Sequence, residues 1–158
     1  MSTLVFYVGY LFKRDSAVGL EVGRLLEAER VPAVELSGDA LYMVDEMRRL
    51  SPTKAILVGA VQRGRPPGTI EIYKFKPYVY NNQLEAQDAL RPSLEGRISL
   101  EDLLIGLSIF GTPTDEIYVA ECEPPVLEDG VGLSPEGRKC AEELAKRVKE
   151  LYRELCTK

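Results

Sequence analysis

The chain has 158 residues, of which 45% are hydrophobic and 28% charged, a balance typical of one globular domain spanning residues 1–158. Its net charge of −5 argues against nucleic acid as the main partner, because phosphate binding needs a clustered excess of Lys and Arg. No apolar run approaches the roughly 20 residues that span a bilayer, and the first residues lack the basic region of a signal peptide, so we expect a cytoplasmic protein with no membrane span.

Short apolar runs alternate with helical patterns along the chain. Residues 4–8 and 55–58 are continuous apolar runs, as in strands buried on both faces. Residues 69–73 alternate between apolar and polar side chains, which places them at a sheet edge. The predicted strands are residues 4–8, 32–36, 54–59, 69–73 and 115–121.

Helical patterns fill most of the segments between these strands. A helix is predicted from residue 15 or 16 to about residue 30, with Asp15 or Ser16 as its N-cap. Further helices are predicted at 39–50, at 99–110 and from residue 134 onward, where a serine, a proline and a glutamate open an amphipathic pattern. Residues 75–96 show no clear period, and we interpret them as a long loop.

This order of elements predicts an α/β fold, a three-layer sandwich. A mostly parallel, twisted sheet of about five strands has helices on both faces and one antiparallel edge strand at 69–73. Ligand sites in such folds lie beyond the carboxyl ends of the strands. The loops at 10–16, 60–68 and 122–133 are therefore the expected site.

Several segments along the chain share a pattern with one enzyme family. Residues 8–19 read Val-Gly-Tyr-Leu-Phe-Lys-Arg-Asp-Ser-Ala-Val-Gly. This segment resembles the opening motif of the hydrogenase maturation proteases, which remove the C-terminal tail of a [NiFe] hydrogenase large subunit after nickel insertion. Further segments are similar to that family in the same order, namely 56–64 with 67–70, 93–94 with 100–104, and 123–124 with 132–136 and the last helix.

The resemblance implies three ligand positions for the nickel of the immature large subunit. They are an acidic residue after the aspartate Asp15, an aspartate at a strand end, and a histidine before the third helix. Here these positions hold Ser16, Gly59 and either Glu95 or Gly96, and the chain has no histidine. A glycine offers no side-chain donor and a serine hydroxyl is a poor ligand at neutral pH. We therefore predict a degenerate site around Asp15, Ser16 and Glu95, with no bound metal and no cofactor.

Two functions follow from the resemblance, and the sequence leaves open whether the chain is an enzyme. One is a non-catalytic module that binds or assembles a protein partner, such as a hydrogenase large subunit or a subunit of a related complex. The alternative is an active endopeptidase that cuts the large-subunit tail. A phosphate-binding loop at residues 9–19 is disfavoured, because the segment lacks both the Walker ending and the G-x-G-x-x-G spacing.

Four cations in the first and second loops are candidate binding residues. Lys13, Arg14, Arg63 and Arg65 would make the crevice basic in a chain that is acidic overall. They are either ordinary solvated loop residues or a docking site for an acidic partner or a free C-terminus.

Two carboxylates at the end of the last strand have two interpretations. Glu121 and Glu123 are two residues apart, so a strand would place them on one face as a carboxylate pair. Glu123 precedes Pro124, which is also typical of a chain that leaves the strand into solvent.

The cysteines are too few and too widely spaced for a disulfide framework or a zinc site. Cys122, Cys140 and Cys156 are predicted to be buried or half-buried free thiols. Cys140 and Cys156 lie in one predicted helix, where their separation prevents them from pairing with each other.

Overall fold

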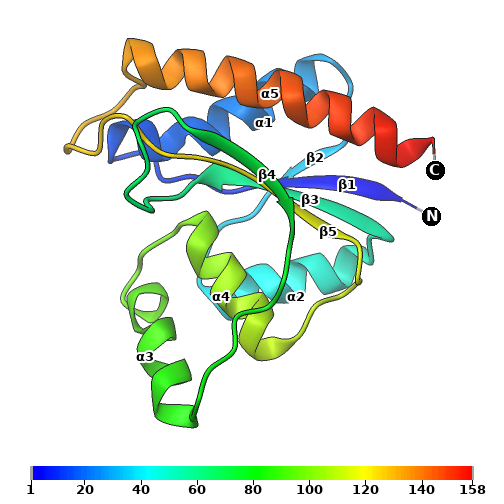
Figure 1. Ribbon diagram of the computed structural model, residues 1–158, viewed down its shortest axis with the longest axis vertical. Coiled ribbons are helices and arrows are strands. Elements are labelled where there is room, and N and C mark those ends of the chain that lie inside the picture. Colours follow the sequence, from blue (N-terminus) through cyan, green and yellow to red (C-terminus); the bar gives the residue numbers. More distant parts are fainter. Residues whose placement is uncertain (1, 158) are drawn as a thin grey trace.

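A five-stranded sheet with helices on both faces forms the centre of the computed structural model, which describes residues 2–157 (Figure 1). The strands are β1 (Thr3–Tyr7), β2 (Ala33–Glu35), β3 (Lys54–Ala60), β4 (Ile70–Lys74) and β5 (Ile117–Cys122). Their order in the sheet is β2-β1-β3-β5-β4, and all pairs are parallel except β4 with β5. The predicted α/β fold with one antiparallel edge strand is confirmed.

The helices form two layers that sandwich this sheet. Helices α1 (Val18–Ala28) and α5 (Pro135–Cys156) cover one face, and α2 (Ala40–Leu50) and α4 (Leu100–Phe110) cover the other (Figure 1). Helix α3 (Gln83–Leu94) packs outside the sandwich against α4 and α2. Within residues 2–157 we find no helix with the length and apolar character needed to cross a membrane.

The central strand β3 shows why the sheet forms where it does. Ile56 and Val58 pack in the core shared with α1 and α5, whereas Ala55 and Leu57 pack in the core shared with α2 and α4. All four side chains are fully buried. A strand that is buried on both faces needs an uninterrupted apolar run, and that run is the pattern from which the strand was predicted.

Side-chain caps define the starts of most helices. The side chains of Asp39, Asn82, Ser99 and Ser134 each accept a hydrogen bond from the backbone N–H three residues further on. Each cap supplies a partner for an N–H group that the first turn leaves unpaired. The predicted starts of α4 and α5 are confirmed.

The interpretation of residues 75–96 as a loop is wrong, because α3 occupies residues 83–94. Its helical pattern is weak since Ser93 is the one buried residue that it contributes. Pro92 interrupts the hydrogen-bond ladder, but it lies in the last turn, where the helix is about to end. A helix that buries so little has no apolar stripe to reveal it.

Candidate functional site

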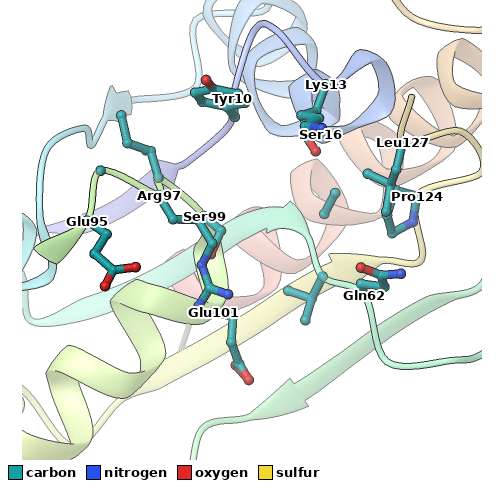
Figure 2. A pocket seen from close by; sticks show the side chains of 14 residues that line it. Tyr10, Lys13, Ser16, Gln62, Glu95, Arg97, Ser99, Glu101, Pro124 and Leu127 are labelled. Carbon is teal, nitrogen blue, oxygen red and sulfur yellow. The ribbon is translucent and has the colours of Figure 1, made fainter. Parts of the chain in front are cut away.

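A cavity of about 710 Å³ opens at the carboxyl edge of the parallel strands (Figure 2). Its walls come from the loops after β1, β3 and β5 and from the segment that precedes α4. This is the edge at which a parallel α/β sheet binds ligands. We call this cavity the edge pocket.

The edge pocket brings together some of the predicted site residues. Lys13 and Ser16 line it from the loop after β1, and Glu95 lines it from the segment before α4. Gly96, the other position that could correspond to the histidine, lies beside Glu95 in the same wall. Asp15 does not line the pocket, because its side chain is buried beneath the loop.

Gly59 also stays out of the pocket lining, because the backbone there is packed too closely for a side chain. A Cβ atom built on Gly59 would lie 2.9 Å from the Cβ of Leu100 and 2.9 Å from the carbonyl oxygen of Val8. Real Cβ atoms are essentially never found so close to other heavy atoms. The strand end where the resemblance implies an aspartate is therefore occupied by the start of α4.

The side chains of the edge pocket do not fit a nickel ion. Within residues 2–157, no three or more Cys, Asp or Glu side chains are grouped so that they could hold a metal, and the sequence has no histidine. Glu101 lines the pocket, but its carboxylate accepts a hydrogen bond of 2.7 Å from the Tyr78 hydroxyl and pairs with Arg63. A divalent transition metal needs several converging donors, and this wall offers Ser16 and Glu95.

Arg97 is a pocket residue that the sequence did not single out. Its guanidinium binds the Asp102 carboxylate through two nitrogens, and Asp102 is buried. This hydrogen-bonded pair raises the pKa of Arg97, so the side chain is a permanent cation in the pocket wall. Ser99 donates a further hydrogen bond of 2.7 Å to Asp102 and completes the support.

Asp15 does not cap the helix that follows it, contrary to one of its two predicted roles. Helix α1 begins at Val18 after a short 3-10 turn, and no side chain caps either element. The Asp15 carboxylate instead accepts hydrogen bonds from the Val126 N–H at 2.9 Å, the Ser134 N–H at 2.9 Å and the Ser134 hydroxyl at 2.6 Å. Asp15 therefore attaches the first loop to the last loop and to the start of α5.

Two arginines of the second loop are paired with carboxylates inside the protein. Arg63 donates to Glu121 at 2.6 Å, and Arg65 donates to Glu121 at 2.9 Å and to Glu123 at 3.0 Å. Glu121 and Glu123 share one face of the chain, as predicted, but the interpretation that Glu123 leads into solvent is wrong, because it is 5% exposed. The positive charge of this loop is compensated within the chain.

The pKa shifts in this network agree with its geometry. The hydrogen bond to Glu121 is the largest of the effects that raise the pKa of Arg63. Burial by itself would raise the pKa of Glu123, but hydrogen bonds from the Arg63 N–H and from Arg65 outweigh it, and the pKa is lowered. Tyr78, beside Arg63 in a second cavity of about 300 Å³, has its pKa raised to about 12 by burial and by its bond to Glu101.

The two cations of the first loop are also paired, but at the surface. Lys13 lies 2.5 Å from Asp129, and Arg14 lies 3.3 Å from Glu128. Both carboxylates are more than two-thirds exposed, so solvent screens these pairs and leaves them easy to rearrange. Of the four predicted binding cations, Lys13 is the one that lines the edge pocket.

Exposed apolar side chains lie in the segments at the carboxyl edge of the sheet, and the sequence patterns did not predict them. Residues 2–157 contain eight exposed large hydrophobic side chains. Six of them belong to loops or helix ends at the carboxyl edge of the sheet, namely Leu11, Phe12, Leu41, Tyr42, Leu94 and Val131. We call these six residues the apolar rim. Hydrophobic periodicity along the sequence assigns each of these residues to a loop or a helix end. It does not show which loops lie next to one another in the folded chain.

Comparison with known proteins places the fold among hydrogenase maturation proteases. The chain is similar to the hydrogenase maturating endopeptidase HybD from E. coli, with 20% identity, 98% of this chain and 93% of the other covered, and a TM-score of 0.67. It is also similar to the [NiFe] hydrogenase maturation protease HybD from Thermococcus kodakarensis, with 15% identity, 96% and 99% covered, and a TM-score of 0.64. A hydrogenase 2 maturation peptidase from a Thaumarchaeota archaeon gives 22% identity, 96% and 97% covered, and a TM-score of 0.60.

These likenesses extend over nearly the whole chain, and at such low identity they establish the fold. No protein-family model and no curated protein sequence matches the chain. The resemblance inferred from the sequence segments is confirmed at the level of the fold.

Proposed function

We propose that this chain is a hydrogenase maturation protease-like protein that binds or assembles a protein partner and lacks nickel-dependent endopeptidase activity. The partner that the resemblance suggests is a hydrogenase large subunit or a subunit of a related complex. The observation that carries this proposal is the edge pocket of about 710 Å³ together with the apolar rim at the same edge of the sheet.

The apolar rim supports a protein partner. Phe12 is 57% exposed, Leu94 73% and Val131 67%, although each is a large apolar side chain. The Gly130 N–H donates to the Phe12 carbonyl at 3.0 Å, which holds the loops of Phe12 and Val131 side by side. Exposed apolar side chains that lie side by side near a concavity are typical of a protein-binding surface.

The chemistry of the pocket wall supports the loss of nickel-dependent cleavage. Gly59 has no space for the side chain that the family places there, and Ser16 replaces an acidic ligand. The pocket wall also holds the Arg97 guanidinium, which is paired with Asp102 and has no lone pair to offer a metal ion. Lys13 adds a second positive charge on the opposite loop.

One observation favours the alternative of an active endopeptidase. Ser16 and Glu95 line the same cavity, so two oxygen-bearing side chains face a bound partner from opposite walls. A partner that carries its own nickel would have to supply the remaining ligands.

Binding and cleavage are tested together with a [NiFe] hydrogenase large-subunit precursor that retains its C-terminal tail. We expect a complex on size-exclusion chromatography and an intact tail by mass spectrometry, with or without added Ni²⁺. A Phe12→Asp/Val131→Asp variant should weaken the complex at least tenfold. Val79→Asp is the matched control, because Val79 is 89% exposed and lies outside the apolar rim.

The possible results of that experiment distinguish an active endopeptidase from a binding module. Tail removal that depends on Ni²⁺ would establish the endopeptidase and overturn the loss of activity. Absence of a complex with the precursor would exclude this partner, and equal binding by the rim variant and the Val79 control would exclude the rim as the docking surface.

A further inference from the structure

Cys122 and Cys140 meet in the buried layer between the sheet and α5. Cys122 ends strand β5 and is fully buried, and Cys140 lies in the second turn of α5 and is 5% exposed. Both thiols belong to one core cluster between the sheet and this helix, and each shifts the pKa of the other. The Cys140 thiol donates a hydrogen bond to the Gly68 carbonyl, with 3.8 Å between the sulfur and the oxygen.

The contacts of the segment that contains Gly68 also indicate that the two thiols are neighbours. Gly68 precedes β4, and the first residue of that strand, Ile70, pairs with Cys122 across the sheet. Cys140 and Cys122 therefore both contact the start of β4, from the helix side and from within the sheet. The third cysteine, Cys156, is exposed at the far end of α5.

We propose that Cys122 and Cys140 are a redox pair that closes to a disulfide when the protein meets hydrogen peroxide. The Cys140 thiolate attacks one peroxide oxygen, the O–O bond breaks, and the sulfenic acid of Cys140 forms while the second oxygen leaves as water after taking a proton. The Cys122 sulfur then displaces the sulfenic hydroxyl, which leaves as water with the Cys122 proton. Two thiols are oxidised to one disulfide, and one peroxide is reduced to two waters.

The pKa shifts of the two thiols indicate which cysteine reacts with peroxide first. The neighbouring Cys140 thiol, followed by burial, raises the pKa of Cys122, and the neighbouring Cys122 thiol lowers the pKa of Cys140. Cys140 therefore forms the thiolate first, and the thiolate is the nucleophile. A small oxidant suits this site, because the 5% exposure of Cys140 leaves little access.

Closure of this disulfide would act on the edge pocket. The bond joins the two ends of residues 123–139, a segment that contributes Pro124 and Leu127 to the pocket wall. The same segment contains Ser134, which Asp15 holds at the start of α5. Oxidation would therefore tether one wall of the pocket to the body of the protein.

The experiment uses Cys156→Ser, which removes the exposed thiol and leaves the pair. After hydrogen peroxide treatment of the folded protein, we expect the mass to fall by about 2 Da as two hydrogens leave, and both free thiols to disappear. The thermal midpoint should rise by roughly 5–10 °C, because the cross-link restricts the unfolded chain, and dithiothreitol should reverse both changes.

Cys140→Ala in the same Cys156→Ser background is the control, because one remaining thiol cannot lose mass in this way. The peroxide concentration is chosen with wild-type protein. Its exposed Cys156 shows at which concentration a thiol becomes oxidised. The proposal is overturned if that concentration leaves both thiols of Cys156→Ser free, or adds oxygen to them without a loss of two hydrogens. Peptide mapping that joins either cysteine to another chain would overturn it equally.

Discussion

The Ser134 hydroxyl lies 2.6 Å from the Asp15 carboxylate, although 119 residues separate them in the chain. The same hydroxyl accepts the Gly137 N–H at 2.9 Å and so caps α5. Gly137 has no Cβ because Asp15 oxygens occupy that space, at 2.1 Å from where the Cβ would be. One carboxylate thus joins the loop after β1, the loop after β5 and the last helix, and these two loops form two walls of the edge pocket.

Asp15→Asn should destabilise the protein by roughly 2–4 kcal/mol, because the amide turns one buried acceptor into a donor that faces other donors. Chemical denaturation measures the free energy of unfolding. Asp129→Asn is the matched control, because it removes an aspartate whose side chain is 86% exposed and should change stability by less than ~1 kcal/mol. Similar values for the two variants would contradict a role for Asp15 in joining the loops.

Glu121→Gln should be among the most destabilising single substitutions in this fold. It removes the charge that faces both Arg63 and Arg65 at a site that is 1% exposed, and breaking such a buried pair costs roughly 3–5 kcal/mol. Glu71→Gln is the control, since Glu71 is 52% exposed and lies 3.4 Å from Arg65. A free energy of unfolding within ~1 kcal/mol of wild type for Glu121→Gln would contradict this account.

Glu123 should contribute to the acid sensitivity of the fold. Its pKa is lowered in the folded protein, so its stabilising effect is present above the unfolded value of about 4.3 and is lost as pH falls through the folded pKa. Unfolding free energies measured between pH 7 and pH 3 should therefore fall less steeply for Glu123→Gln than for wild type. Parallel curves for the two proteins would show that Glu123 does not titrate with folding.

The elements that could be predicted from the sequence are those whose cause is local. The apolar run of β3 and the capping residues Ser99 and Ser134 act within their own element, and each was found where it was expected. Helix α3 was missed because it buries so little that its sequence has no apolar period.

The site could be predicted in its position but not in its contacts. The carboxyl edge of the sheet follows from strand direction, and Lys13, Ser16 and Glu95 line the pocket at that edge. The pairing of Arg63 with Glu121 joins residues from different elements, and the tight packing at Gly59 depends on where α4 begins. Such contacts depend on tertiary packing, which no local pattern encodes.

Gly59→Ala should destabilise the protein by roughly 1–3 kcal/mol, because its Cβ would overlap the Leu100 Cβ and the Val8 carbonyl. Gly59→Asp should cost more, since it adds a carboxylate at the same crowded position. Thermal unfolding of both variants beside wild type measures the order of their stabilities. Wild-type stability for Gly59→Asp would show that α4 can move away and make room for a ligand at this strand end.

Nickel binding should be weak in the wild-type protein and should respond to residue 16. Calorimetric titration with Ni²⁺ is expected to show no one-to-one site of micromolar affinity, because Ser16 and Glu95 are too few donors beside Arg97. Ser16→Glu adds a third carboxylate to the pocket wall, beside Glu95 and Glu101, at a half-buried position that faces the cavity.

We expect Ser16→Glu to bind Ni²⁺ more tightly than wild type by roughly tenfold, because an added carboxylate within a few ångström of the ion supplies both a donor and a negative charge. Ser37→Glu is the matched control, because it adds the same charge to an exposed serine that does not line the edge pocket. An equal gain in both variants would mean that net charge alone attracts the metal. A micromolar one-to-one site in the wild-type protein would mean that Ser16 and Glu95 already suffice, and the degenerate-site interpretation would then fail.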